Sequence, residues 1–336
     1  MPSTPPAPPR PQRSESRTGL LCGVAAYGIW GLFPLYWPLL EPAGAVEILA
    51  HRMVWSLVTV AVVLAVTRRW QWIRPLLRQP KRLAVAALGA AVISVNWWVY
   101  IWAVNSGHVV ETSLGYFVNP LATIALGVLV LRERLRRAQW VAVGAGAVAV
   151  AVLTAGYGKP PWIALTIAAT FSTYSLVKKK VGLGGLESMA VETAVQFLPA
   201  LGVLLFLGGR GQSTFTSEGA GHALLLMGTG VITAVPLVSF GAAAVRLPLS
   251  VIGMLQYLAP VFQFALGLVV FHEAMPPERW AGFALVWVAL AVLTGDALRT
   301  ARHARVQVQT ARRQAAVGNT EKTIAPQDTE TTAQRG

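Results

Sequence analysis

Charged and polar side chains interrupt several long apolar stretches of this sequence. Glu47, His51 and Arg52 lie in the apolar segment 45–67, and Glu192 lies in another such segment. A charged group in apolar surroundings is costly, so each should line a substrate pathway or form a structural ion pair. Glu47 and His51 are one helical turn apart and face the same way, whereas Arg52 points somewhat aside. Glu47 is near enough to the segment end to be in water, and Arg52 is expected deeper.

A second set of residues combines aromatic rings with amides. Asn96 and Tyr100 are one turn apart in an apolar segment, and Trp97 lies beside them. Aromatic surfaces that carry a few amides suit a partly apolar organic ligand, including a cationic one. The other interpretation is an aromatic belt at the membrane interface, which explains the mid-segment Asn96 poorly. We predict that these three residues line a substrate cavity, and we add Gln196, one turn after Glu192.

Prolines inside apolar segments mark a third set. Pro120 and Pro260 have no N–H group, which frees the carbonyl groups of Tyr116 and Gln256. Such backbone is tolerated inside a membrane where it lines a cavity or packs on protein, although an inert kink that shapes packing is equally compatible. Pro34 predicts a similar bend. The residues expected to line the cavity near these three bends are Trp30, Tyr36, Tyr116, Asn119, Gln256 and Tyr257.

The composition identifies the solvent around these segments as lipid. Charged residues make up 12% of the chain, hydrophobic residues make up 54%, and the mean hydropathy is +0.55. A soluble domain needs about a quarter of its residues charged. The net charge of +14 would suggest a nucleic-acid partner in a soluble protein, but here we expect none. The single cysteine excludes an internal disulfide or a cysteine-rich metal site, and we expect no metal or cofactor.

Ten apolar segments are long enough, or nearly so, to cross a bilayer as helices, which takes about 20 residues. We therefore predict an all-α integral membrane protein with ten transmembrane helices, flanked by a disordered cytoplasmic tail at 1–17 and by a cytoplasmic tail at 299–336 that begins as a basic juxtamembrane arm and runs into disorder. A cleaved signal peptide is the competing interpretation of the first segment, but no small-residue cleavage site follows it. The ten segments are 18–39, 45–67, 83–106, 109–131, 138–154, 160–177, 187–207, 221–245, 249–271 and 280–298.

The cations in the loops predict the orientation. Lys and Arg gather on the cytoplasmic side of a membrane protein. The loops on one side carry most of them, whereas the loops on the other side contain only Lys159, Arg210 and Arg279. This alternation predicts that both chain ends are cytoplasmic, in a bacterial-type inner membrane.

One stretch of sequence occurs twice, 140 residues apart. Residues 115–133 read GYFVNPLATIALGVLVLRE, and residues 255–273 read LQYLAPVFQFALGLVVFHE. Shared positions at a fixed offset indicate an internal duplication. The offset contains five spans, an odd number, so the second repeat (155–298) must be inverted relative to the first (18–154). Inverted repeats are a transporter architecture with the substrate site between the halves.

The same offset places Glu192 at the position equivalent to Arg52. We hypothesise that these opposite charges balance one another across the halves, or that they belong to two related gates. Glu133 and Glu273, which end equivalent helices, are expected to order helix ends or loops. Glu111 lies near the outer end of its helix and is expected to be solvated.

These motifs carry a family resemblance. The Pro-x12-Glu spacing in both halves, Trp140, Trp280 and the ten spans resemble the drug/metabolite transporter superfamily with paired EamA repeats. The runs WGLFPLYW (30–37), EILAHRMVWS (47–56) and VNWWVYIWAVN (95–105) resemble RarD-type permeases. The resemblance implies transport of small organic molecules across the inner membrane. RarD-type members are commonly described as chloramphenicol-sensitivity or permease proteins, which leaves the substrate open.

The sequence favours a transporter over an enzyme. It contains no G-x-S-x-G or H-E-x-x-H motif, and its one Gly-Lys-Pro run lacks the Ser or Thr and the spacing of a P-loop. We therefore predict a secondary transporter that works by alternating access, driven by a proton or other ion gradient, by exchange or by downhill flow. The alternatives are a membrane-embedded enzyme acting on a lipid-linked substrate, a structural or sensory protein, and a channel.

Overall fold

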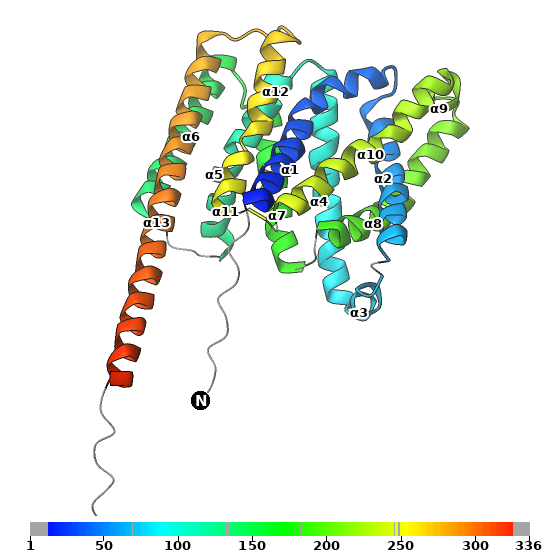
Figure 1. Cartoon of the computed structure of the whole chain (residues 1–336). Coiled ribbons are helices and arrows are strands. Elements are labelled where there is room, and N and C mark those ends of the chain that lie inside the picture. Colours follow the sequence, from blue (N-terminus) through cyan, green and yellow to red (C-terminus); the bar gives the residue numbers. More distant parts are fainter. Residues whose placement is uncertain are drawn as a thin grey trace, which may run out of the picture.

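The computed structural model describes residues 13–68, 70–131, 135–181, 183, 185–244, 246–247 and 249–324, and all regular secondary structure in these residues is helical (Figure 1). Glu133 lies outside the described residues. The elements are α1 (Arg13–Leu32), η1 (Phe33–Leu35), η2 (Trp37–Leu40), α2 (Ala45–Thr67), α3 (Ile73–Leu77), α4 (Pro80–Asn105), α5 (Val109–Leu131), α6 (Arg137–Tyr157), α7 (Trp162–Val181), α8 (Gly185–Gly209), α9 (Thr214–Ser217), α10 (Gly219–Ala244), α11 (Leu249–Leu255), α12 (Leu258–Val269) and α13 (Pro277–Ile324).

Most of these helices are suited to a bilayer. Within the described residues, nine candidate spans are long and apolar enough to cross a membrane, and one of them runs through both α11 and α12. The chain is therefore an all-α, multi-pass membrane protein. Helix α7 is the tenth segment of the sequence prediction; it is 20 residues long but ends in the polar run Lys178–Lys180. The count of ten spans stays a prediction.

Helices extend into both predicted tails where the structure describes them. Helix α1 already begins at Arg13, and α13 continues past residue 298 to Ile324, well beyond the other helices (Figure 1). Residues 299–324 are poor in apolar side chains but rich in Ala, Arg and Gln. These are strong helix formers, and an existing helix is extended at little cost. The composition of this segment therefore suits a helix that continues from the last span.

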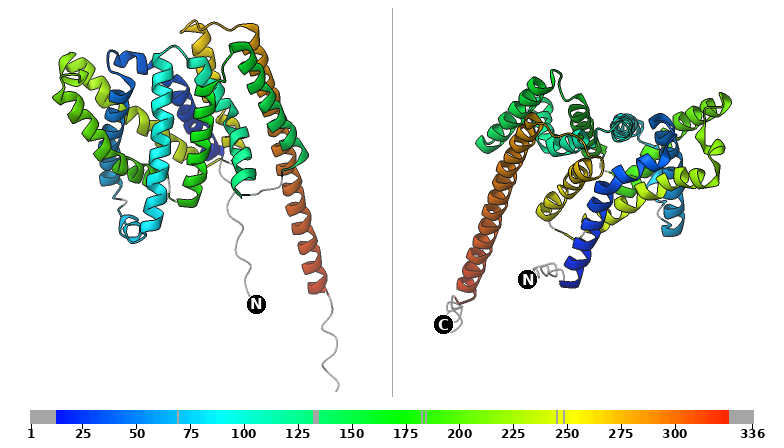
Figure 2. Two further views of the ribbon diagram at one scale, coloured as in Figure 1. Left: turned by 180° about the vertical axis from the view of Figure 1, so that it is seen from behind. Right: turned by 90° about the horizontal axis from the view of Figure 1, so that it is seen from above.

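The helices pack in pairs that repeat along the chain. In the ten-span scheme, α4 is the third span and packs on α7, the sixth. Helix α10 is the eighth span and packs on α1, the first. Three other pairs, α2–α8, α5–α12 and α6–α13, join spans that are five apart. Helices α6 and α13 lie together at one end of the bundle, and α9 lies at the other (Figure 2). This is the pairing expected of two five-helix halves related by a two-fold axis.

Glycines allow the closest helix crossings. A Cβ added at Gly230 on α10 would lie 2.3 Å from the carbonyl carbon and oxygen of Trp55 on α2. At Gly115 on α5, an added Cβ would lie 3.0 Å from the Ala164 carbonyl oxygen of α7. Small residues let helix backbones approach in membranes, where lipid provides no hydrophobic drive for association. The α2–α10 crossing therefore depends on the absence of a side chain at Gly230.

The connection between α12 and α13 caps α5. The Glu273 carboxylate accepts hydrogen bonds from the N–H groups of Val109 and Val110, which begin α5. The first N–H groups of a helix have no partner inside it and favour an anion. Gly267 makes the approach possible, because a Cβ there would lie 3.1 Å from the Val110 nitrogen. Glu273 therefore orders a helix end, as expected from its position in the sequence. The helix is α5, which lies in the other predicted repeat.

The environment of Glu273 changes its acidity. Burial raises the pKa of the carboxyl from 4.5 to about 7, although the hydrogen bonds from Val110 and Val109 act to lower it. Arg279 lies 3.9 Å from the carboxylate. The carboxyl group is therefore partly protonated near neutral pH.

We predict that Gly230→Ala lowers the unfolding temperature of the detergent-solubilised protein. The added methyl group must push α10 off α2, and overpacking of this kind costs about 1–3 kcal/mol. Gly241→Ala on the same helix is the matched control, because an added Cβ there meets nothing within 4 Å. Equal unfolding temperatures for the two variants would show that the crossing is loose.

We predict that stability falls as the pH is raised from about 5 to 8, and that Glu273→Gln weakens this dependence. A folded-state pKa above the unfolded one favours folding fully below the unfolded value of 4.5, and the benefit is lost as pH rises through about 7. Thermal unfolding of both proteins across this range measures the effect, with Glu278→Gln at an exposed position as control. An unchanged pH profile in Glu273→Gln would rule the group out.

Candidate functional site

Arg52 is a buried cation in the second span. Helix α2 places it seven residues after Ala45, and only 4% of the residue is exposed. Its Nε donates a hydrogen bond to Thr233 Oγ1 of α10 at 3.0 Å. Thr233 lies one turn after Gly230, on the same face of the helix. The close α2–α10 crossing therefore brings this hydroxyl group within reach of the arginine.

Three aromatic rings surround the guanidinium group. Its central carbon lies 4.1 Å from the ring centroid of Trp97, 5.4 Å from that of Trp37 and 5.8 Å from that of Phe33. The rings come from α4, η2 and η1. Ring faces attract a cation, most strongly where water is excluded. The rings therefore offset part of the cost of burying this charge.

No carboxylate in the described part of the chain neutralises Arg52. Among the described residues, no Asp or Glu oxygen lies within 4.0 Å of its side-chain nitrogens. A guanidinium has five N–H donors, and Thr233 accepts from only one of its nitrogens. Removing an unpaired charge from water costs several kcal/mol, so a buried cation without a counter-ion calls for a functional explanation.

Two further polar groups next to Arg52 are buried without well-formed hydrogen bonds. In the described part of the chain, neither the Trp37 indole nitrogen nor the Tyr100 hydroxyl makes a hydrogen bond of normal geometry, although the two groups lie close enough to interact with each other. Tyr100 is 2% exposed, and its ring meets that of Tyr116 edge to face at 5.7 Å. Both phenol groups lie within electrostatic range of Arg52. We call the following residues the arginine cluster: Phe33, Trp37, Arg52, Trp97, Tyr100, Tyr116 and Thr233.

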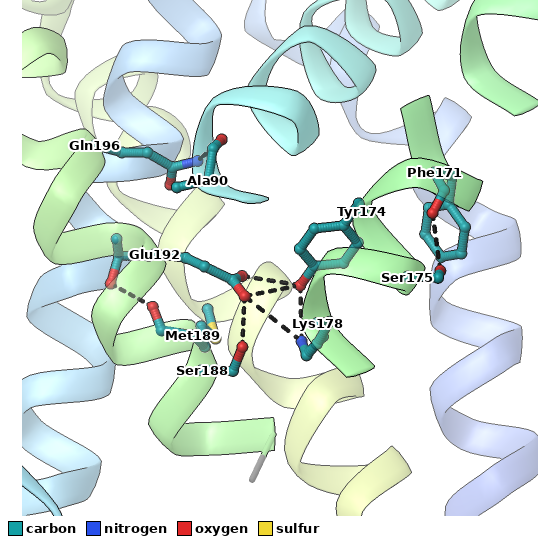
Figure 3. Close-up of polar contacts among 10 residues, drawn as sticks. Ala90, Phe171, Tyr174, Ser175, Lys178, Ser188, Met189, Glu192 and Gln196 are labelled. Atoms are coloured by element: carbon teal, nitrogen blue, oxygen red, sulfur yellow. Dashed lines mark hydrogen bonds and ion pairs between the residues drawn. The ribbon is translucent and has the colours of Figure 1, made fainter. Parts of the chain in front are cut away.

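Glu192 has a different environment, in which every described contact satisfies its charge (Figure 3). The Tyr174 hydroxyl lies 2.9 and 3.0 Å from its two oxygens, and the Ser188 hydroxyl donates at 2.5 Å. Lys178 Nζ lies 3.7 Å from the carboxylate and donates to the Tyr174 oxygen at 2.7 Å. We call these four residues the glutamate cluster. It contains an anion that is already neutralised.

The structure does not pair Arg52 with Glu192. Each lies seven residues after the start of its helix, α2 at Ala45 and α8 at Gly185, in line with the 140-residue offset. The start of α2 approaches Thr214, which follows α8, so the two helices run in opposite directions and the charges lie near opposite ends of the pair. The hypothesis of direct charge balance therefore fails in this conformation. The idea of two related gates stays a prediction.

The amides of the sequence prediction join helices. Asn96 on α4 is fully buried and donates to the Ile167 carbonyl of α7 at 3.0 Å. Gln196 on α8 donates to the Ala90 carbonyl of α4 at 2.9 Å (Figure 3). Their carbonyl oxygens have no partner among the described residues. Both side chains hold α4 in place next to the arginine cluster.

The proline bends differ from one another. Helix α5 continues through Pro120, and Asn119 there accepts a hydrogen bond from Ser172 of α7 at 2.6 Å. The ninth span is interrupted between α11 and α12, one turn before Pro260. Pro34 lies in η1, where α1 ends.

The remaining aromatic candidates divide between two places. Trp30 and Tyr36 pack on the apolar core that contains Trp37 and Tyr100, and Tyr36 donates to the Leu225 carbonyl at 2.6 Å. Tyr257 packs on a separate apolar core formed by α5, α6, α7 and α13, and the neighbouring Gln256 is exposed. The last two therefore lie outside the arginine cluster.

Two glutamates predicted to be in water are helix caps. Glu47 is 3% exposed, and its carboxylate accepts from the Thr214 N–H at 2.8 Å and from the Ser213 hydroxyl at 3.0 Å. Glu111 is half-buried and accepts from the Ile163 N–H of α7 at 3.1 Å. Connections between spans fold over the ends of α2 and α5 and shield these carboxylates from water. A position near the end of an apolar segment does not reveal such a cover. His51 stacks on Phe215 in one of these connections at 4.8 Å.

Several cluster residues were missed by sequence reasoning. Phe33 and Trp37 lie in the run WGLFPLYW, so the family motif already contained them. Tyr174 and Lys178 are one turn apart, a spacing that predicts contact on a helix. Nothing in the sequence singles out Thr233 among the many threonines in apolar segments.

A cavity of about 170 Å³ lies elsewhere, between α5, α7 and α13, and none of its lining residues belongs to either cluster. The arginine cluster itself is closed in this conformation, since Trp37, Arg52 and Tyr100 are all buried. A ligand can reach it only after the helices move. Among the described residues there is also no group of three or more His, Cys, Asp or Glu side chains that could hold a metal.

The sequence is similar to those of known proteins. A model of the EamA-like transporter family matches residues 17–155. Protein RarD of Streptomyces exfoliatus is 67% identical over 298 residues, which cover 89% of this chain and 95% of that protein. Protein RarD of Escherichia coli (strain K12) is 39% identical and covers 86% and 97%. The uncharacterized transporter YojE of Bacillus subtilis (strain 168) is 42% identical and covers 84% and 95%.

A solved structure, titled only "Crystal structure of protein", has the same fold. It aligns with a TM-score of 0.54 at 21% identity, over 84% of this chain and 99% of the other. The fold likeness agrees with the sequence matches, which extend over nearly the whole length of relatives named as transporters. The chain therefore belongs to the EamA-like transporter family of drug/metabolite transporters, as a RarD-type member.

Proposed function

We propose that the protein is a secondary transporter that moves a small organic molecule across the inner membrane by alternating access. The observation that carries the proposal is the arginine cluster, a buried and unneutralised cation among aromatic rings inside the membrane. Polar groups of this kind within spans mark substrate pathways. Family membership favours a transporter over the alternative of an enzyme.

In the proposed mechanism, two inverted repeats, residues 18–154 and 155–298, move relative to each other. The helix pairs α2–α8, α5–α12 and α6–α13 support this arrangement, because each joins spans that are five apart. The pair α4–α7 becomes the pair α10–α1 when each span is replaced by the one five places along the chain. The arginine and glutamate clusters occupy equivalent places on α2 and α8. In such folds, rocking one half against the other opens a central site alternately to each side.

The orientation is proposed with both chain ends cytoplasmic. Figure 1 shows α1 beginning and α13 ending on the same side of the bundle, which supports it. The opposite side then faces outwards. There the carboxylates of Glu47, Glu111 and Glu273 cap helices from neighbouring segments. Opening towards the outside must break contacts of this kind.

Transport in proteoliposomes tests the proposed function. We expect saturable, protein-dependent uptake of at least one compound from a panel of small metabolites, led by amino acids and amphenicols. Runs with and without an imposed proton gradient distinguish a coupled transporter from downhill flow, and protein-free liposomes provide the baseline. Chemical conversion of a compound in detergent, without flux into sealed vesicles, would replace the transporter with the membrane enzyme.

Cysteine labelling tests the orientation. In a Cys22→Ser background, we predict that an impermeant maleimide labels Thr216→Cys, at an exposed position in α9, in intact cells. Arg78→Cys, exposed in the connection between α3 and α4, should react only after lysis. Labelling of both from outside, or the reverse pattern, would contradict the inverted arrangement.

A further inference from the structure

We propose that the arginine cluster binds the carboxylate group of the transported molecule, so that the substrates are organic monocarboxylates with an apolar or aromatic body. This inference rests on the proposed function and adds the substrate class. It begins with the charge of Arg52, which no carboxylate within 4.0 Å neutralises in the described part of the protein. An anion that enters with the substrate supplies the missing counter-charge.

The hydrogen-bonding groups around Arg52 are mostly donors. Thr233 accepts the Nε–H, and no described group accepts from the two terminal nitrogens. The Trp37 indole N–H is a donor only and lies near the Tyr100 hydroxyl, which can donate in turn; neither group makes a hydrogen bond of normal geometry. A ligand that satisfies this set must present several acceptor oxygens. A carboxylate does so, and its two oxygens match the planar fork of a guanidinium.

The single charge selects among anions. Arg52 is the one cation of the arginine cluster, so a monoanion leaves the buried site neutral, whereas a phosphate monoester near −2 leaves a net negative charge in it. An excess charge in a site closed to water is costly. The site therefore favours carboxylates over phosphates.

The same geometry disfavours cationic substrates, although the aromatic residues considered alone in the sequence were compatible with a cationic ligand. The guanidinium already occupies the faces of Trp97 and Trp37, at 4.1 and 5.4 Å. A second cation would meet its repulsion and find no carboxylate partner there. The glutamate cluster gives no alternative, because Lys178, Tyr174 and Ser188 already satisfy Glu192. The remaining rings, such as Phe33 and Tyr116, suit the apolar body of the ligand.

Ligand-dependent stabilisation of the purified full-length protein tests the proposal, since a ligand that binds the folded state raises its unfolding temperature. The probes are phenylacetate, its neutral amide phenylacetamide, the cation phenethylamine and the dianion phenyl phosphate. We expect saturable stabilisation by phenylacetate and little by the other three. Equal or tighter binding of the amide or the amine would overturn the role of the anion. Tighter binding of phenyl phosphate would overturn the choice of carboxylate.

Substitutions locate the site. Arg52→Gln should abolish the phenylacetate effect, and Arg52→Lys should weaken binding by about tenfold or more, because an ammonium lacks the bidentate fork. Arg246→Gln, at an exposed arginine, is the control and should bind normally. If the Arg52 variants fail to fold, Tyr100→Phe keeps the ring and removes one donor, and we expect about tenfold weaker binding. Full binding by Arg52→Lys, or by Tyr100→Phe if the Arg52 variants do not fold, would place the carboxylate elsewhere.

Failure of this inference is distinguishable from failure of the proposed function. Uptake of some compound into proteoliposomes without any carboxylate preference would leave the transporter intact and overturn the substrate class. Arg52-dependent phenylacetate binding without flux of any compound would keep the site and overturn the transporter.

Discussion

The structure depends on how a positive charge is kept inside a membrane without a counter-ion. Arg52 has rings on several sides, one hydroxyl acceptor and no carboxylate within 4.0 Å among the described residues. The surrounding architecture provides these few contacts. Gly230 lets α10 approach α2 closely enough for Thr233 to reach the guanidinium, and Asn96 and Gln196 hold α4, which carries Trp97, against α7 and α8. In the proposed function, this incomplete neutralisation makes the cluster receptive to a ligand.

A second constraint acts at the helix ends. A helix leaves its first N–H groups unsatisfied, and inside or near a bilayer water cannot always supply the missing partners. Glu47, Glu111 and Glu273 each supply a carboxylate to the start of a helix from a different segment. These caps join the connections on one side of the bundle to the spans. A change of conformation that separates the halves there has to exchange such contacts for water.

The sequence alone predicted the helical class, the membrane setting and the family, because hydropathy, cation distribution and a long internal repeat are all properties of the linear chain. It also singled out Arg52, Trp97, Tyr100 and Tyr116, which the structure brings into one cluster. It could not predict partners across helices. The Arg52–Glu192 pairing was inferred from register, yet equivalent positions on antiparallel helices lie near opposite ends. Thr233 and the burial of Glu47 depend on helix crossings and on a folded connection that no local pattern encodes.

The most direct measurement is a structure of the protein in a lipid nanodisc with a bound monocarboxylate, such as phenylacetate. We expect density for the carboxylate within hydrogen-bonding distance of the Arg52 guanidinium and the Tyr100 hydroxyl, with the ring of the ligand among the aromatic side chains. This expectation would be contradicted by a structure in which the ligand lies away from α2 and a glutamate of the protein itself pairs with Arg52.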